Sequence, residues 1–167
     1  IKQGLKISRG DFIFLLDGDD EFKKNKLKEI ISLKNKKFLI MDNHIIFKNN
    51  NFVYKKNKFY KNSILYNFFF NPWPDKVCTS CISGSKKLFQ NFFRKLKINE
   101  VNFIAVDILL IIYYLKKTYI IKEVLTIKKI LEKIEDTKYS NKFSKIYWKR
   151  RIEQHIYLKN FIKKLIL

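Results

Sequence analysis

Apolar and polar residues along the chain follow the periods of strands and helices in turn. Short apolar runs bounded by turn residues predict buried strands, over residues 12–16, 38–42, 77–83 and 119–127. Apolar residues three and four positions apart favour helices, which we expect over 3–8, 23–35, 85–96, 103–114 and 143–167. Strands that alternate with helices predict an α/β sheet. No internal repeat or linker divides the chain.

Two further apolar segments predict a β-hairpin at the edge of this sheet. Residues 45–47 and 52–54 flank three consecutive asparagines, which suit a tight turn. His44, just before the hairpin, is interpreted as a polar residue at a strand edge rather than a ligand.

His155, in the basic C-terminal helix, is interpreted as solvated. The apolar surface of that helix is predicted from Ile146, Tyr147, Ile152, Ile156, Phe161, Leu165 and Ile166.

The first predicted strand ends in a cluster of carboxylates. Asp17, Asp19 and Asp20 occupy three of four positions directly after the apolar run. Open α/β sheets bind ligands outside the carboxyl ends of their strands, and clustered carboxylates repel one another unless a cation or hydrogen bonds compensate. Hard oxygen ligands suit Mg²⁺ or Mn²⁺ carrying a substrate's phosphates. The cluster alone fits a solvated acidic turn equally well.

The charge of the chain is strongly positive but not specific. The 167 residues carry a net charge of +21, almost entirely from lysine, with four arginines. Proteins that read nucleic acid depend on arginine for bidentate contacts, and A/T-rich codons are sufficient to explain abundant lysine. A diffuse positive surface attracts sugar nucleotides, anionic lipid headgroups or nucleic acid. No apolar run approaches the ~20 residues of a membrane-spanning helix.

Cys78 and Cys81 are separated by two residues. A zinc site would need two further ligands, and the chain has only His44 and His155 to offer as histidines. A redox pair would be expected to open a helix, whereas an apolar Ile-Ser-Gly segment follows. We therefore favour reduced structural thiols in a cytosolic protein.

Residues 10–22, Gly-Asp-Phe-Ile-Phe-Leu-Leu-Asp-Gly-Asp-Asp-Glu-Phe, resemble the metal-binding signature of family-2 glycosyltransferases with the GT-A fold. Residues 79–85 resemble the family's acceptor-side strand and turn, and residues 147–153 are similar to a segment of bacterial members. The resemblance covers residues 2 to about 158, and its acidic cluster is the specific part. It implies a Rossmann-like mixed sheet flanked by helices. Residues 1–130 would form its metal and acceptor side, and residues 131–167 a helical extension packed on it or on a membrane surface.

The resemblance implies the donor chemistry. Asp17, Asp19 and Asp20 would hold Mg²⁺ or Mn²⁺ and a nucleotide-diphosphate sugar. Asp19 is expected to be the direct metal ligand, and Asp17 is the second residue assigned to the metal. Asp17 and Asp20 would contact the ribose or lie behind the direct ligand. The bound cation would neutralise the diphosphate as the glycosidic oxygen leaves.

The resemblance also implies the acceptor side. Asp107 falls where the family places its base, which deprotonates an acceptor hydroxyl for inverting displacement at the anomeric carbon. The acceptor would be a glycan or lipid-linked glycan of a growing bacterial surface polysaccharide. Trp73 could stack on an acceptor sugar or simply pack, and Ser83 and Gly84 would line the acceptor turn. The alternative for Asp107 is an ion pair with a lysine.

The sequence departs from the family pattern at two places. The nucleotide-binding βαβ portion is expected to precede Ile1, so this chain is interpreted as an N-terminally truncated fragment that would not bind a nucleotide fully alone. Residues 125–131 lack the donor-side histidine of many members, so that metal contact is absent or replaced.

Two other functions compete with this interpretation. A haloacid-dehalogenase-type phosphatase would need Thr or Val where Glu21 stands. A non-catalytic basic module could bind nucleic acid or an anionic membrane surface, nucleic acid being the less favoured partner. We expect a cytoplasmic enzyme with peripheral contact to the inner face of the cytoplasmic membrane.

Overall fold

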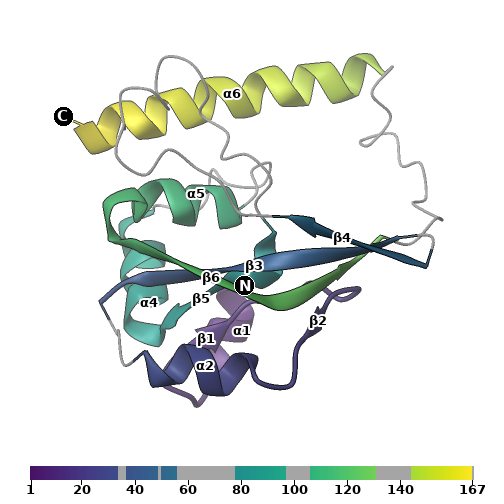
Figure 1. Ribbon diagram of the computed structural model, residues 1–167. Helices are drawn as coiled ribbons and strands as arrows, with labels where there is room; N and C mark the ends of the chain where they lie inside the picture. Colours follow the sequence, from purple (N-terminus) through teal and green to yellow (C-terminus); the bar gives the residue numbers. More distant parts are fainter. Residues whose placement is uncertain (34–36, 49, 56–77, 97–105, 131–143, 167) are drawn as a thin grey trace.

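The computed structural model describes residues 1–33, 37–48, 50–55, 78–96, 106–130 and 144–166 (Figure 1). Within these ranges a mixed sheet is flanked by helices, so the predicted α/β class is confirmed. The helices are α1 (Lys2–Ile7), α2 (Lys26–Ser32), α4 (Lys86–Lys95), α5 (Val106–Tyr113) and α6 (Lys145–Ile166), with 3₁₀ turns η1 (Thr79–Cys81) and η3 (Leu115–Lys117). The strands are β1 (Phe12–Phe14), β2 (Glu21–Phe22), β3 (Leu39–Lys48), β4 (Asn51–Lys55), β5 (Ile82–Ser85) and β6 (Thr118–Lys129).

The long strands β3 and β6 run parallel through the middle of the sheet. The strand order is β1-β5-β3-β6-β2, and β4, which lies off this path, pairs with β3. The pairings other than β3 with β6 are antiparallel. The register of β3 against β6 shifts around Asn43, so the sheet is irregular at this position.

Apolar side chains form a core on each face of the sheet. The larger core joins Leu39, Met41 and Ile82 of the sheet to α4, α5 and α6. The smaller core joins Ile40 of β3 to Ile30 of α2 and to β6. Alternation along β3 explains this division, since successive side chains of a strand point to opposite faces. Figure 1 shows α5 and α6 on one side of the sheet and α2 on the other.

Several predicted elements have different bounds in the structure. The segments 38–42 and 45–47 form one strand, β3, rather than a buried strand and a separate hairpin arm. Its turn into β4 has Asn50 at φ 59, in the left-handed region that asparagine tolerates. The segment 77–83 is only partly a strand, because residues Thr79–Cys81 form a 3₁₀ turn before β5.

The first predicted strand is shorter and less buried than expected. β1 spans three half-buried residues, and in the described part of the chain it pairs with β5 alone. The edge position explains the partial burial. The acidic turn, residues 17–20, therefore follows an edge strand of the described sheet. Leu15, shortly before the turn, is buried.

The C-terminal helix is confirmed, and of the residues predicted for its apolar surface Phe161 packs against the larger core. Leu158 and Ile162 are its buried apolar residues in the larger core, on the side facing α5. Ile152 and Ile156 are exposed, and His155 is half-buried rather than solvated. Among the described residues, no helix combines the length and the apolar character needed to cross a bilayer.

Candidate functional site

The acidic turn is fixed at both ends by backbone hydrogen bonds. The Leu15 amide donates to the Ile82 carbonyl at 3.0 Å, and the Asp20 amide donates to the Asp17 carbonyl at 3.1 Å. Asp17 and Asp19 are exposed, whereas Asp20 is buried. The turn thus presents two carboxylates to solvent and directs one inward.

Asp20 is held by donors from η1 and β6. Its Oδ2 accepts the Ser80 hydroxyl at 2.6 Å and lies 3.4 Å from the Cys78 Sγ, which donates to it. Its Oδ1 accepts the Lys129 amide at 3.2 Å. Ser80 Oγ also accepts the Asp17 amide at 2.9 Å, so a single hydroxyl joins both ends of the turn. These bonds satisfy a buried carboxylate that would otherwise be costly.

Asp107 lies beside the turn although it is distant in sequence. Its Oδ2 accepts the Thr79 hydroxyl at 2.8 Å, and its position in the first turn of α5 suits a negative charge. Although Asp17 is exposed as a residue, partial desolvation of its carboxyl raises its pKa, and the nearby Asp20 and Asp107 carboxylates raise it further. The Thr79 hydroxyl and Lys128 act in the opposite direction. The structure thus places Asp17, Asp20 and Asp107 within electrostatic reach of one another.

Lys128 lies near enough to the acidic turn to act on it electrostatically, and the sequence analysis does not single it out. It stands in the segment of β6 where the expected donor-side histidine is absent, and its charge lowers the pKa of Asp17. It also lowers the pKa of His44, for which burial is the larger cause. The available signal was its position next to the family-like Leu-Thr segment, but one lysine among many gave no reason to select it.

A buried lysine, Lys26, forms a hydrogen bond with η1. Lys26 Nζ donates to Asp42 Oδ1 at 2.8 Å, to the Ser80 carbonyl at 2.6 Å and to Thr126 Oγ1 at 2.6 Å. The ammonium lies 4.3 Å from the centroid of the Phe22 ring, and both Lys26 and Asp42 have 0% of their side chain exposed. The Thr126 hydroxyl donates to Asp42 Oδ2 at 2.6 Å. This network connects α2, β3 and β6 to the residue that holds the acidic turn.

The residues assigned to the acceptor turn lie in the interior. Ser83 is fully buried and its hydroxyl faces the Ile40 carbonyl, while the Cα of Gly84 faces side chains of Leu39, Leu88 and Phe89. This burial argues against direct acceptor contact by Ser83 and Gly84. Trp73, with the proline-containing loop around it, lies outside the described residues.

His44 is buried, with 3% of its surface exposed, which corrects its interpretation as a strand-edge residue. The reason is that β3 has β4 on one side and β6 on the other at this position. Its neighbours include Cys78 and Cys81, neither of which forms a disulfide. Among the described residues, these three are the group of potential ligands whose atoms converge.

The oxygen ligands of the acidic turn fit a hard divalent cation. The turn's three carboxylates do not converge on one point in the described structure, but Mg²⁺ is usually bound by one or two carboxylates together with substrate phosphates and water. Desolvation is the main cause of the raised pKa of Asp17, and the Asp20 and Asp107 carboxylates raise it further; a bound cation would offset this second effect. Asp17 and Asp19 are the carboxylates open to such a cation.

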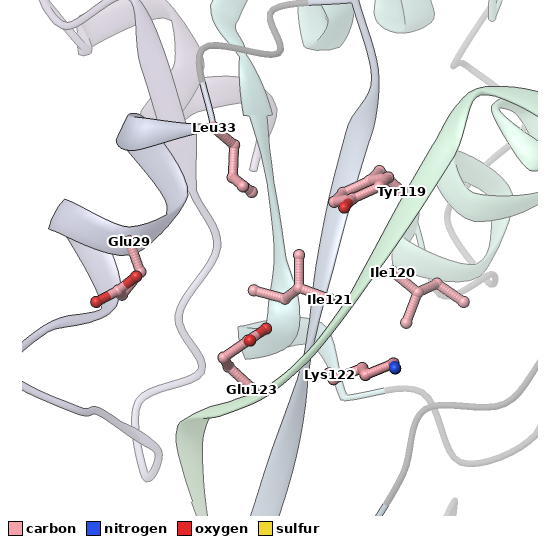
Figure 2. Close-up of a pocket in the computed structure, with 7 residues that line it drawn as sticks. All are labelled: Glu29, Leu33, Tyr119, Ile120, Ile121, Lys122 and Glu123. Carbon is pink, nitrogen blue, oxygen red and sulfur yellow. The ribbon is translucent and has the colours of Figure 1, made fainter.

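Two hollows differ in their relation to these residues. One, of about 510 Å³, runs along α1 and β1 between Leu5 and Phe14 and reaches Asp17 and Thr79. The other, shown in Figure 2, is lined by α2, the residue after it and the first half of β6. The acidic turn contacts β6 farther along, near Lys129. The hollow in Figure 2 is therefore separate from the site.

The sequence model of the family described as glycosyl transferase family 2 matches residues 1–97, more than half of the chain. The chain belongs to this family. None of the curated proteins matches it. The mixed sheet flanked by helices is the GT-A-like fold expected of a family-2 glycosyltransferase. In general the family uses nucleotide-sugar donors, glycan acceptors and divalent metals, and the matched residues include the acidic turn and η1.

Proposed function

We propose that the chain takes part in metal-dependent transfer of a sugar from a nucleotide-diphosphate donor to a hydroxyl of a growing bacterial surface glycan. Residues 1–130 supply the metal and acceptor side of the GT-A domain, and residues 131–167 a helical extension. The observation that carries the proposal is the Thr79 hydroxyl, which bonds Asp107 at 2.8 Å and also reaches Asp17. Acids from two distant parts of the chain thereby meet at one hydroxyl.

The acidic turn is assigned to the donor. Asp19 and Asp17 hold Mg²⁺ or Mn²⁺, which when bound neutralises the diphosphate as it leaves. Asp20 positions the turn, because its carboxylate is buried and already accepts hydrogen bonds from η1 and β6. Lys128 adds a positive charge at the same edge, where it can attract the diphosphate and take the place of the absent histidine.

Asp107 is assigned as the general base. It accepts the proton of the acceptor hydroxyl while that oxygen attacks the anomeric carbon from the face opposite the diphosphate, giving inversion. The Thr79 hydroxyl and the Ile108 amide, which donates to Asp107 Oδ1 at 2.9 Å, orient its carboxylate. A positioned base typically contributes a factor of about 10²–10⁴ in rate.

The test uses the natural protein at its full length with a panel of nucleotide-diphosphate sugars. We expect turnover to disappear with a chelator and to return with Mg²⁺ or Mn²⁺. Asp19→Asn should weaken Mn²⁺ binding and turnover together. Asp107→Asn should lower kcat at least about 100-fold with Mn²⁺ affinity retained. Asp11→Asn, an exposed acid just before β1, is the matched control.

Two results would contradict the proposal. If Asp19→Asn leaves Mn²⁺ binding and sugar-nucleotide turnover unchanged, the enzymatic assignment fails. Tight nucleic-acid binding that weakens steeply with salt and survives both substitutions would instead favour the non-catalytic basic module.

We further propose that the protein works in the cytoplasm at the inner face of the cytoplasmic membrane, where lipid-linked acceptors are presented. Support comes from α6, whose Trp148, Ile152 and Ile156 are exposed at successive four-residue intervals. Exposed lysines accompany them along the same helix: Lys145, Lys149, Lys163 and Lys164. Apolar residues flanked by cations suit an anionic bilayer surface.

A further inference from the structure

Three potential ligands for a soft or borderline metal gather next to the acidic turn. His44 comes from the centre of β3, Cys81 ends η1, and Cys78 directly precedes it. One ligand atom from each lies within 4.8 Å of the other two. Their exposed fractions are 3%, 1% and 0% for His44, Cys78 and Cys81, so the cluster is closed to bulk solvent.

The His44 ring contains an unusual polar atom. Its Nδ1 is buried and has no hydrogen-bond partner among the described residues. Buried polar atoms without a partner are rare in folded proteins, because the lost hydration is not replaced. A metal ion between His44 and the two thiols would give this imidazole the partner that it lacks.

The spacing is close to that of a tetrahedral zinc site. Zinc lies about 2.3 Å from thiolate sulfur and about 2.0–2.1 Å from imidazole nitrogen, which places neighbouring ligand atoms roughly 3.5–3.8 Å apart. The observed limit of 4.8 Å is within about 1 Å of this arrangement, a change that side-chain rotation can supply. A fourth donor lies next to this group rather than within it, since Asp20 Oδ2 is 3.4 Å from Cys78 Sγ.

We propose that His44, Cys78 and Cys81 form a structural zinc site, completed by the Asp20 carboxylate. Binding releases the two thiol protons to solvent, and both sulfurs coordinate as thiolates. Two thiolates and an imidazole select zinc over Mg²⁺ or Mn²⁺, so this site does not compete with the exposed carboxylates of the turn. The bound zinc would link η1 to β3 and, through Asp20, to the acidic turn.

A redox role for the cysteines explains less of the cluster. A disulfide would join Cys78 to Cys81 and pass two electrons to an oxidant, but it would leave His44 without a partner. The metal accounts for the imidazole and both thiols together. Sequence spacing alone does not favour a zinc site here, because His44 and the cysteines belong to segments far apart in the chain.

The experiment uses the full-length natural protein, reduced, stripped of metal and titrated with Zn²⁺ or Co²⁺. We expect one ion per chain, and for Co²⁺ the intense visible bands of tetrahedral coordination with thiolate charge-transfer absorption. Cys78→Ser, Cys81→Ser and His44→Ala should each weaken Zn²⁺ binding more than about 100-fold, beyond the loss usual for residues behind the ligands. His155→Ala is the matched control, as the chain has two histidines.

A readout on the unaltered protein keeps the proposal falsifiable if those variants misfold. X-ray absorption at the zinc edge should show sulfur together with nitrogen and oxygen neighbours. Asp19→Asn should leave Zn²⁺ binding unchanged, which separates this site from the proposed donor cation. The proposal is overturned if the reduced protein binds no zinc, if zinc is retained without the cysteines, or if the two cysteines form a disulfide in place of binding metal.

Discussion

At the scale of single residues, the site depends on two adjacent hydroxyls in η1. The Thr79 hydroxyl donates to Asp107 and lies near Asp17. The Ser80 hydroxyl donates to Asp20 and accepts the Asp17 amide. The sequence could identify the carboxylates because acids cluster after an apolar run. It could not identify the hydroxyls' partners, because a serine or threonine has no characteristic spacing to an acid that follows or precedes it by dozens of residues.

Removal of the Thr79 hydroxyl tests its role directly. Thr79→Val keeps the shape of the side chain but leaves Asp107 Oδ2 without its donor. We expect kcat to fall about tenfold, with a loss of roughly 1 kcal/mol in the free energy of unfolding. Steady-state kinetics and urea denaturation would measure the two effects. Thr79→Ser, which keeps the hydroxyl, should retain most of the activity; equal losses in both variants would show that the hydroxyl is not what matters.

At the scale of elements, sequence periodicity located most helices and strands but misjudged the middle of β3. The strand expected from the sequence ends at Asp42, and His44 is interpreted as a polar residue at a strand edge. In the structure the strand continues, because each polar side chain lies inside. Asp42 pairs with Lys26 of α2, and Asn43 Nδ2 donates to carbonyls of β6 at 2.9 and 3.0 Å. A local pattern cannot anticipate buried polar residues whose partners come from distant elements.

The buried pair of Lys26 and Asp42 should be costly to break and less costly to replace. Lys26→Met leaves a buried carboxylate without its cation, so we expect a loss of about 3–5 kcal/mol in the free energy of unfolding by urea denaturation. The double variant Lys26→Met with Asp42→Leu should recover part of this loss, because no unpaired charge remains.

Lys28→Met is the matched control for this prediction, since Lys28 is exposed on the same helix. It should change stability by no more than about 0.5 kcal/mol. A double variant as unstable as Lys26→Met alone would mean that the hydrogen bonds of Lys26 to Ser80 and Thr126, rather than its charge pairing, hold these elements together.

At the scale of the whole molecule, α6 carries both buried and exposed apolar residues. Leu158 and Ile162 enter the larger core, whereas Trp148, Ile152 and Ile156, nearer the start of the helix, are exposed. The sequence predicted a basic amphipathic helix but not which of its apolar residues would pack. Apolar residues are spread around this helix, so the helical period does not single out one face. The exposed apolar residues are then available for a second surface.

Vesicle binding by the full-length protein tests whether that surface is a bilayer. We expect binding to vesicles of zwitterionic lipid with an anionic fraction, weakening as salt rises because the lysines contribute electrostatically. Replacement of Trp148, Ile152 and Ile156 by serine should weaken binding at least about tenfold, since less apolar area would insert. Sedimentation with vesicles would measure this, and circular dichroism would confirm that the helix remains.

The hairpin offers a matched control for the same measurement. Phe52, Val53 and Tyr54 of β4 are exposed to a similar degree, so their replacement by serine removes comparable apolar surface from another part of the molecule. If both triple variants weaken binding equally, general apolar exposure explains it and α6 has no special role. An affinity for vesicles that does not change with their anionic lipid content would contradict the electrostatic part of the proposal. A selective loss in the α6 variant would support the proposed contact of this helix with the bilayer.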